Sequence, residues 1–459
     1  MSLAIRSRSV KIWLGACAHT LATIELPLMY GQNYITTVGA RTQTTNMPAP
    51  CTRETMEPWK VLSRSLTFQS PDQKSWWNSL GPVAGASMSQ TGYSIDAQYK
   101  NLLLIYSTLI PSLGPYYSRN QSSRTWNDCM ANPDGPLDVS VNYQENSKCA
   151  FRMTMEPVGI HAGTERDPIN ELAAKQLLQN LDRIQAGTDL SWFDHFEQIV
   201  VMNSDARRNR DTIQSIGCKS QHVVGVDFQD GPFTVKAYVS PLLSSVMTGI
   251  SFLEVMFGSL RSLTEKMNLR LDLKPVEDYL TGKDGVLGEK TYVSFDCKCP
   301  TESRIKIYSA LWVTSLEEVR DLWTLGGRLT GSMIEEGFAI VEKAWHLLLP
   351  RRLPNGEERS RITVNFNWEL SPKDGSIAPK LYFLVDEDFD EHVSKAVVSL
   401  FRDLGWTKNA DTHLSLEKEA YSIREFEGQS NVYIWLAIAY SAEGPYITVY
   451  SNPLAGVKV

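Results

Sequence analysis

Three candidate β-strands of this 459-residue chain each carry a lysine followed two positions later by a tyrosine. Side chains at positions i and i+2 lie on one face of a strand, so each pair presents an ammonium group and a phenol ring to the same side. Ammonium groups bind anions, and aromatic faces stabilise positive charge. Together they suit a reaction in which an anion departs and leaves a carbocation. The pairs are Lys236 with Tyr238, Lys306 with Tyr308, and Lys380 with Tyr382.

Further cations and tyrosines extend this set. Arg304 stands two positions before Lys306, and Arg152 lies on an earlier candidate strand. Tyr446 and Tyr450 share one face of a later strand. Five cations that face one lumen require an anion, because like charges are not left buried without partners. A diphosphate meets this requirement, and each close charge pair contributes about 4 kcal/mol at an effective dielectric near 20, before desolvation is subtracted. Several cations could therefore stabilise a departing diphosphate in place of magnesium.

Lysine and tyrosine are also ordinary residues on the exposed face of a half-buried strand, so a single pair would mean little. These pairs, however, recur in register with a larger repeat. Strand-like pairs are joined by turn sequences such as Asp230-Gly231-Pro232, and their centres lie about 70 to 85 residues apart, which is typical of an internal repeat. The expected hairpins are 137–143 with 151–155, 223–228 with 233–239, 292–297 with 305–308, 362–368 with 381–385, and 433–440 with 446–450.

Amphipathic helices are expected between these hairpins, over residues 96–113, 169–184, 333–349 and 391–404. The alternation predicts an α/β fold, a closed ten-stranded antiparallel β-barrel built from five repeated α-β-β-α units with the helices outside. Closure removes exposed sheet edges, and a barrel of this strand number leaves a lumen that can hold two ligands. We expect residues 51–459 to form this one barrel domain.

Residues 1–50 differ in composition from the rest. No acidic residue occurs before Glu25, and a Thr/Gly/Asn-rich stretch leads to Pro48 and Pro50. The basic start resembles a weak presequence with a processing site at Cys17, but His19 interrupts its apolar run. We expect a flexible N-terminal extension, with a targeting peptide or a misassigned start codon as the alternatives.

Composition excludes several classes of protein. The net charge is −7 and no basic face is evident, which argues against a nucleic-acid partner. No run of 18 uncharged apolar residues occurs, so no membrane span is expected. The seven cysteines are odd in number and scattered, which suits reduced thiols in a cytoplasmic protein better than a disulfide framework. Cys297 and Cys299 could form half of a zinc site, but no second Cys/His pair has matching spacing, and we expect no metal.

Ordered motifs over about residues 58–453 resemble one known family. The matching segments are 76–77 (Trp-Trp), 113–116 (Leu-Gly-Pro-Tyr), 135–142, 189–193, 235–238, 304–308, 323–328 (Trp-Thr-Leu-Gly-Gly-Arg), 379–382 and 444–450. The chain resembles the fungal indole prenyltransferases of the dimethylallyltryptophan synthase type, whose fold is a ten-stranded barrel of α-β-β-α units. The resemblance implies metal-independent transfer of a dimethylallyl group from dimethylallyl diphosphate to an electron-rich aromatic ring in secondary metabolism, without a cofactor.

The resemblance also assigns roles to residues. It implies that the diphosphate is bound by Arg152, Lys236, Arg304, Lys306 and Lys380. It implies that the allyl cation is shielded by Tyr238, Tyr308, Tyr382, Tyr446 and Tyr450. For the assembly, a homodimer is an open expectation.

One acidic position departs from the family pattern. The family has an acidic residue, usually glutamate, after the Gly-x-Pro turn, which binds the indole N–H; this chain has Asp138. The carboxylate is one carbon shorter, which shifts it by more than an ångström where positioning governs rate. Val223 stands near the position where tryptophan-using members carry lysine. Both changes favour a larger acceptor than free tryptophan: an indole derivative or alkaloid, a cyclic dipeptide, a bisindole quinone or a phenolic polyketide.

Two other functions remain open. The acidic run 386–390 could chelate magnesium, as Asp-rich motifs do in metal-dependent prenyl-chain enzymes, but it precedes a candidate helix and is better explained as an N-terminal cap. A barrel that binds an isoprenoid or aromatic metabolite without turning it over is the second alternative. Five cations and the acid at position 138 favour the enzyme.

Overall fold

The computed structural model describes residues 57–116, 125–132, 134–145, 147–282, 291–349, 361–385, 390–421 and 431–455. The chain divides into two units, residues 1–55 and 56–459. The expected extension over residues 1–50 lies outside the described residues, as do positions 386–389 of the acidic run.

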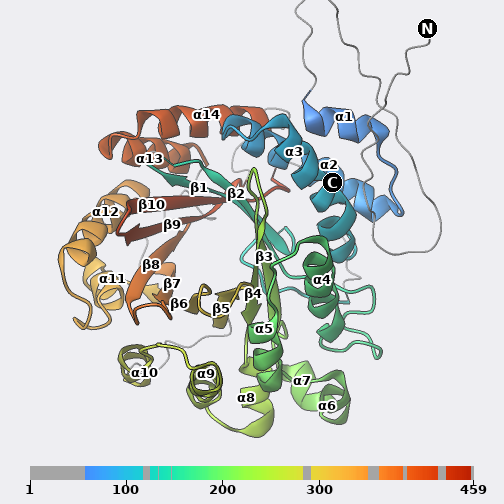
Figure 1. The fold of residues 1–459 in the computed structure, drawn as a ribbon, viewed down its shortest axis with the longest axis vertical. Coiled ribbons are helices and arrows are strands. Elements are labelled where there is room, and N and C mark those ends of the chain that lie inside the picture. Colours follow the sequence, from blue (N-terminus) through green and yellow to red (C-terminus); the bar gives the residue numbers. More distant parts are fainter. Residues whose placement is uncertain are drawn as a thin grey trace, which may run out of the picture. The chain divides into compact units, whose positions relative to one another are not determined.

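Ten antiparallel strands close into one barrel, in the order β1-β10-β9-β8-β7-β6-β5-β4-β3-β2 (Figure 1). Consecutive strands are neighbours around the barrel, and β1 closes the sheet against β10. The predicted barrel and its five hairpins are therefore confirmed. The strands are β1 Leu137–Gln144, β2 Ala150–Met155, β3 His222–Asp227, β4 Thr234–Val239, β5 Tyr292–Asp296, β6 Ile305–Val313, β7 Ile362–Leu370, β8 Ile377–Leu384, β9 Tyr433–Ser441 and β10 Gly444–Ser451.

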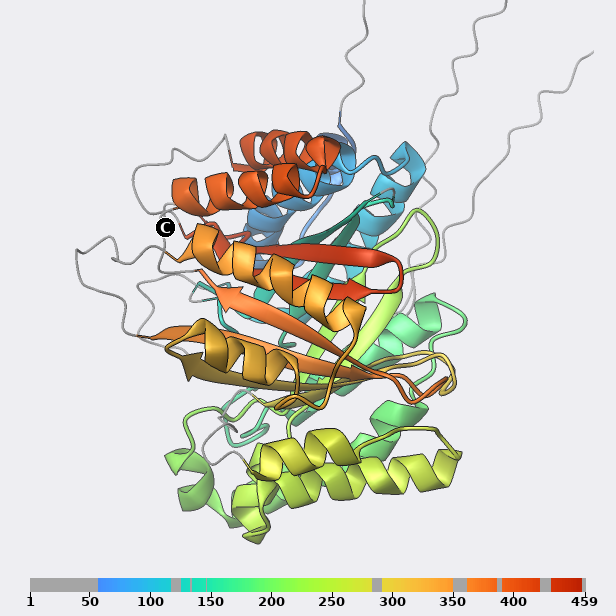
Figure 2. The ribbon, with the colours of Figure 1, turned by 90° about the vertical axis from the view of Figure 1, so that its left-hand side faces the viewer.

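Helices surround the barrel, and Figure 2 shows α11 to α14 lying over its outer face. Their apolar sides pack against the outward side chains of the strands, such as Ile305 and Ile307, which are fully buried. The helices are α1 Pro58–Ser65, α2 Pro71–Gln90, α3 Ile95–Leu104, α4 Glu171–Ile184, α5 Ser191–Phe196, α6 Asn203–Arg208, α7 Arg210–Ser215, α8 Leu242–Thr248, α9 Phe252–Met267, α10 Lys274–Thr281, α11 Leu316–Trp323, α12 Ser332–Leu348, α13 Asp390–Asp403 and α14 Thr407–Tyr421.

Some element boundaries differ from the expectation. The predicted helix 96–113 ends as an α-helix at Leu104 and continues as the π-helix η1 (Ile105–Leu109) and the 3-10 helix η2 (Ile110–Ser112). Pro111 lies in that last turn and has no backbone N–H to donate, so regular α-helical bonding does not resume there. Strand β6 extends five residues past Tyr308, to Val313, because it pairs with β7 along its full length.

Alternation along the strands separates the core from the lumen. In β6, Ile305 and Ile307 face the helices, whereas Lys306 and Tyr308 face inward. Tyr308 belongs to a second apolar cluster that is separate from the main core. The barrel therefore has an aliphatic outer layer and a polar, aromatic interior, as the lysine–tyrosine spacing predicts.

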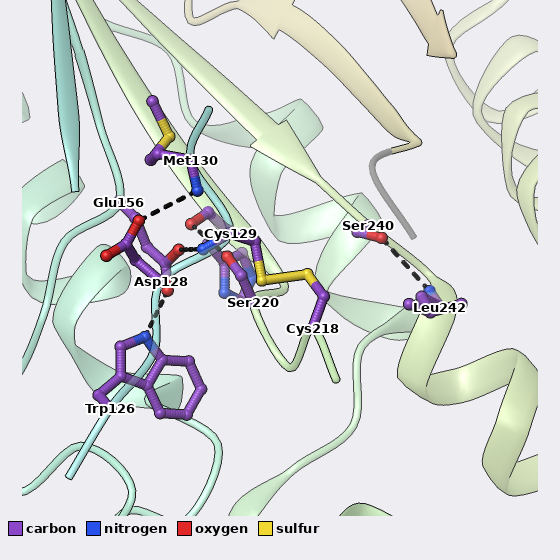
Figure 3. Close-up of a disulfide and its surroundings, with 10 residues drawn as sticks. Trp126, Asp128, Cys129, Met130, Glu156, Cys218, Ser220, Ser240 and Leu242 are labelled. Atoms are coloured by element: carbon purple, nitrogen blue, oxygen red, sulfur yellow. Dashed lines mark hydrogen bonds between the residues drawn. A yellow bond between two sulfur atoms is a disulfide. The ribbon is translucent and has the colours of Figure 1, made fainter. Parts of the chain in front are cut away.

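The expectation of uniformly reduced thiols is wrong for one pair. Cys129 and Cys218 form a disulfide, shown in Figure 3, although 89 positions separate them in sequence. No spacing rule links such distant cysteines; the barrel brings the segment before β1 next to the segment before β3. Cys149, Cys297 and Cys299 are free.

Among the described residues, no single helix has the length and hydropathy of a membrane span. The pair α8 and α9 meets the length and composition criteria only when taken together, and it is bent by 114°.

Candidate active site

Four of the five predicted cations lie on strands and face the lumen at neighbouring positions. Lys236, Lys306 and Lys380 are each under 10% exposed, and Arg152 is half-buried. Arg304 directly precedes β6 and keeps 42% of its side chain exposed. The barrel thus gathers the predicted cations in one layer near the hairpin turns of β5–β6 and β7–β8.

Three carboxylates alternate with these cations, and the sequence reasoning missed them as a set. Asp227, Asp296 and Glu369 lie at or near the ends of β3, β5 and β7. Each is the register partner of the cation on the preceding strand. The pairs are Arg152 with Asp227, Lys236 with Asp296, and Lys306 with Glu369. Their common position, one acid near the end of the first strand of three successive hairpins, was the signal that could have revealed them.

Asp296 is the hub of this ion network. Its carboxylate accepts two hydrogen bonds from Arg304, at 2.9 and 3.0 Å, and lies 3.8 Å from the ammonium of Lys236 and 3.9 Å from that of Lys306. Burial would raise the pKa of Asp296, but the three cations lower it far below the usual range. The lumen therefore supplies counter-ions for these cations, which corrects the expectation that they all wait for an external anion.

Lys380 is the exception among the lumen cations. Its register partner on the following strand is Ala439, where the three earlier cations have an acid. In the described part of the chain, no carboxylate oxygen lies within ion-pair distance of its ammonium. Its nitrogen lies 3.5 Å from the hydroxyl of Thr448, and 5.0 and 5.2 Å from the ring centres of Tyr382 and Tyr446. Burial, followed by the charges of Arg152 and Lys306, lowers the pKa of Lys380 well below its ordinary value.

Lys306 is also buried, but unlike Lys380 it has carboxylates near its ammonium group. Burial lowers the pKa of its ammonium to about 8, while Asp296 and Glu369 oppose the effect. Burial therefore disfavours the charged form of both Lys306 and Lys380, which lie on the side of the lumen formed by β6, β8 and β10. An anionic ligand on this side would favour the charged form.

The predicted tyrosines form a chain of adjacent rings across the lumen. The ring centres are 5.6 Å apart for Tyr238 and Tyr308, 6.0 Å for Tyr308 and Tyr382, and 5.8 Å for Tyr382 and Tyr450. The hydroxyl of Tyr382 accepts a hydrogen bond from the Asn367 amide at 3.0 Å. Burial raises the pKa of Tyr238 and Tyr382 well above the usual value, so these phenols are neutral.

Two further aromatics complete the lining. Trp435 meets Tyr382 edge-on at 6.4 Å, and Tyr292 is the register partner of Tyr308. Neither follows a lysine–tyrosine spacing on its strand, so the pattern that found the other tyrosines could not find them.

Asp138 lies on β1, is 5% exposed, and faces the same side of the sheet as Ser140, whose partners are Arg152 and Tyr450. The predicted acceptor-binding acid thus shares the lumen with the cations and tyrosines. Val223 is the register partner of Tyr238 near the start of β3. This end of the lumen therefore contains the carboxylate of Asp138 and, at position 223, a valine in place of a lysine.

A barrel with a cationic layer, an aromatic layer and a buried acid matches known enzymes in sequence. The family model for tryptophan dimethylallyltransferase matches residues 72–415. The chain belongs to this family. It is an aromatic prenyltransferase, as the resemblance implied.

Curated relatives of this prenyltransferase come from fungi. It is 30% identical to the reverse prenyltransferase criA of Aspergillus cristatus, over 86% of this chain and 93% of the relative. It is also 30% identical to the indole diterpene prenyltransferase anaPT of Neosartorya fischeri, over 87% of this chain and 92% of the relative.

Solved structures confirm the prenyltransferase barrel. AnaPT from Neosartorya fischeri aligns with a TM-score of 0.76 at 28% identity, over 88% of this chain and 99% of that one. NotF in complex with brevianamide F and DMSPP aligns with a TM-score of 0.77 at 25% identity, over 88% of this chain and all of that one.

Proposed function

We propose that the prenyltransferase binds the diphosphate of dimethylallyl diphosphate between Lys380, Lys306 and Arg152, with Lys236 and Arg304 completing the cationic layer. The observation that carries this proposal is the missing acid beside Lys380, where the alternation of acids and cations stops. Lys380 is buried beside two cations and has Ala439 where an acid would stand. A buried ammonium without a carboxylate gains most from an anionic ligand.

Cleavage of the carbon–oxygen bond then leaves diphosphate on the cations and an allyl cation against the tyrosines. Neutral phenol faces stabilise a cation through the ring quadrupole and exclude water, which would otherwise capture it. The hydroxyl oxygens of Tyr308 and Tyr382 lie 3.4 Å apart in this lining. Tyr446, stacked near Lys380, would mark the boundary between the diphosphate and the prenyl chain.

The acceptor ring attacks the cation and forms the new bond, and a base removes the ring proton. We propose that Asp138 accepts a hydrogen bond from the indole N–H or an equivalent donor, which orients the ring and raises its nucleophilicity. The acceptor we propose is an indole derivative larger than tryptophan, such as a cyclic dipeptide. The shorter acid, the valine at position 223 and the likeness to a structure solved with brevianamide F support this choice. A bisindole quinone or a phenolic acceptor is an alternative within the same mechanism.

We also propose that turnover needs no metal. Support comes from the cationic layer itself, which supplies the positive charge that magnesium would otherwise bring to the departing diphosphate. The purified enzyme should retain most of its activity in excess chelator. Complete loss that only magnesium reverses would favour the acidic run as a metal site.

Product analysis tests the proposed function directly. The enzyme is incubated with dimethylallyl diphosphate and a panel of indoles, cyclic dipeptides, bisindole quinones and phenols, and products are identified by mass and NMR. Recovery of unchanged donor with every acceptor would favour a silent binding protein. A cytoplasmic location and a homodimeric assembly are further proposals, checked by a fluorescent fusion and by sedimentation.

A further inference from the structure

A short segment before β1, residues 125–132, is held at the end of the barrel that contains Asp138. We call it the mouth segment. Its Trp126 indole donates to Glu156 at 2.6 Å, and the Cys129 backbone N–H donates to the same carboxylate at 2.9 Å (Figure 3). The Asn132 amide donates to the backbone oxygen of Leu137, the first residue of β1, at 2.7 Å. The mouth segment is thus tied directly to the strand that carries Asp138.

The mouth segment also reaches the lumen. Ala131 packs against the aromatic cluster that contains Tyr308, Tyr382 and Trp435. In the proposed function, these rings line the chamber in which the acceptor meets the allyl cation. A displacement of the mouth segment would therefore change the wall of the acceptor chamber, while the cations of the diphosphate layer belong to other elements.

One covalent bond crosses from the mouth segment to the neighbouring repeat. Cys129 is bonded to Cys218, which lies shortly before β3. Near the start of β3, Val223 faces Tyr238. The disulfide therefore joins two walls of the same end of the lumen, one carrying Ala131 and the other Val223.

We propose that the Cys129–Cys218 disulfide fixes the mouth segment as a wall of the acceptor chamber, so that its reduction weakens acceptor binding while donor binding is kept. The proposal rests on the proposed function, because it assigns the acceptor to this end of the lumen. It makes the bond a determinant of acceptor specificity that responds to redox conditions. If the protein is cytoplasmic, as proposed above, such a disulfide would be exposed to cellular reductants, and cytosolic disulfides are commonly transient and redox-sensing.

The reaction is an ordinary thiol–disulfide exchange with a dithiol reductant. A thiolate of the reductant attacks the sulfur of Cys129, which is half-buried, whereas Cys218 is only 7% exposed. The bond between Cys129 and Cys218 breaks, and Cys218 leaves as a thiolate that takes up a proton. The second thiol of the reductant then releases Cys129 as a thiol. The reductant is oxidised to its disulfide by two electrons.

Steady-state kinetics of the two redox forms test the proposal. The enzyme is oxidised or treated with dithiothreitol, the state of the cysteines is verified by intact mass, and KM is measured for donor and for acceptor. We expect the acceptor KM to rise on the order of tenfold on reduction, as mispositioning at a binding wall does, with less than about a twofold change in the donor KM. Cys129→Ser should match the reduced enzyme with or without dithiothreitol. Cys299→Ser removes an exposed free thiol and should respond to dithiothreitol like the parent enzyme.

Several outcomes would overturn the proposal. They are an acceptor KM equal in both redox states, donor and acceptor KM rising by the same factor, or a mass that shows both cysteines reduced after oxidation. Hydrogen exchange of residues 125–132 gives a readout independent of turnover and of the serine variant, and exchange should be faster in the reduced form. If no acceptor is prenylated in either state, the proposed function fails. Unchanged hydrogen exchange would separately refute the proposal that the disulfide fixes the mouth segment.

Discussion

Replacing Lys380 by methionine should stabilise the unliganded enzyme and weaken donor binding at the same time. The two effects have one cause. The ammonium is buried beside Arg152 and Lys306, and in the described part of the chain it lacks the carboxylate that Lys236 and Lys306 have. A buried charge without a partner costs stability, and a methionine of similar length removes that cost. The same charge is the one that a diphosphate would neutralise.

The expected changes in stability and donor affinity can be worked out from the surroundings of Lys380. Holding a lysine neutral at pH 7 costs at most about 5 kcal/mol, at about 1.4 kcal/mol for each pH unit below its ordinary pKa near 10.4. Structural relaxation around the lysine and the nearby Thr448 hydroxyl reduce this cost. We therefore expect Lys380→Met to raise the free energy of unfolding by roughly 1 to 3 kcal/mol. A close ammonium–phosphate pair contributes about 4 kcal/mol at an effective dielectric of 20. With about half of this left after desolvation, removing the pair should raise the donor Kd about thirtyfold.

The pH dependence has a definite sign. Because the folded state lowers the pKa of Lys380, the unfolded state binds more protons, and the stability of the parent enzyme rises with pH. The advantage of Lys380→Met should therefore be greatest at low pH and disappear as pH passes the ordinary lysine pKa. Donor binding should also take up a proton in the parent enzyme, and less of one in the variant.

Denaturant unfolding at several pH values measures the stability. Titration calorimetry with a non-hydrolysable donor analogue measures the affinity, and repeating it in buffers of different ionisation enthalpy measures the proton uptake.

Lys236→Met is the matched control. Its ammonium pairs with Asp227 and lies 3.8 Å from Asp296, so that variant should lose stability, by a few kcal/mol, because it leaves buried carboxylates short of partners. The reasoning is refuted if Lys380→Met loses stability as the control does, or if donor affinity is unchanged.

Three other predictions concern the remaining layers of the lumen. Asp138→Ala should raise the acceptor KM or lower kcat by about 10- to 100-fold, with little change in the donor KM. Asp138→Glu should retain activity with a changed product distribution, measured by chromatography with the acceptor panel. An equal rise in the donor KM would contradict this role of Asp138. Tyr382→Leu should let water capture more of the allyl cation, so the ratio of prenyl alcohol to product should rise several-fold, whereas Tyr382→Phe, which keeps the ring, should stay near the parent ratio. Asp296→Asn removes a negative charge beside Lys306 and should lower the pKa of Lys306 from about 8 by about one unit. The decline of kcat/KM for the donor at alkaline pH should then begin at lower pH. An unchanged pH profile would disprove the coupling between Asp296 and Lys306.

Much of the fold could be predicted because the repeat is visible in residue types. Turn sequences bound each hairpin, and the inward Lys306 and Tyr308 alternate with the outward Ile305 and Ile307. Parity along a strand then places the cations and tyrosines in the lumen without knowledge of the register.

The counter-ions and the disulfide could not be predicted in the same way. Asp227 and Arg152 are neighbours only because β2 pairs with β3 in one particular register. A shift by one residue would separate them. Cys129 and Cys218 meet only after two loops are placed at one end of the closed barrel. The ion pairs and the disulfide depend on how different repeats are placed in space. The sequence pattern predicts only the periodicity within each repeat.

The alanine at position 439 gives the lumen a polarity that its repeats alone would not have. An acid at this position would give every cation on β2, β4, β6 and β8 an acidic register partner on the following strand. Ala439 leaves Lys380 without that partner, so an incoming anion gains most by approaching this side of the lumen. An aspartate here would remove that difference, and we expect it to weaken donor binding.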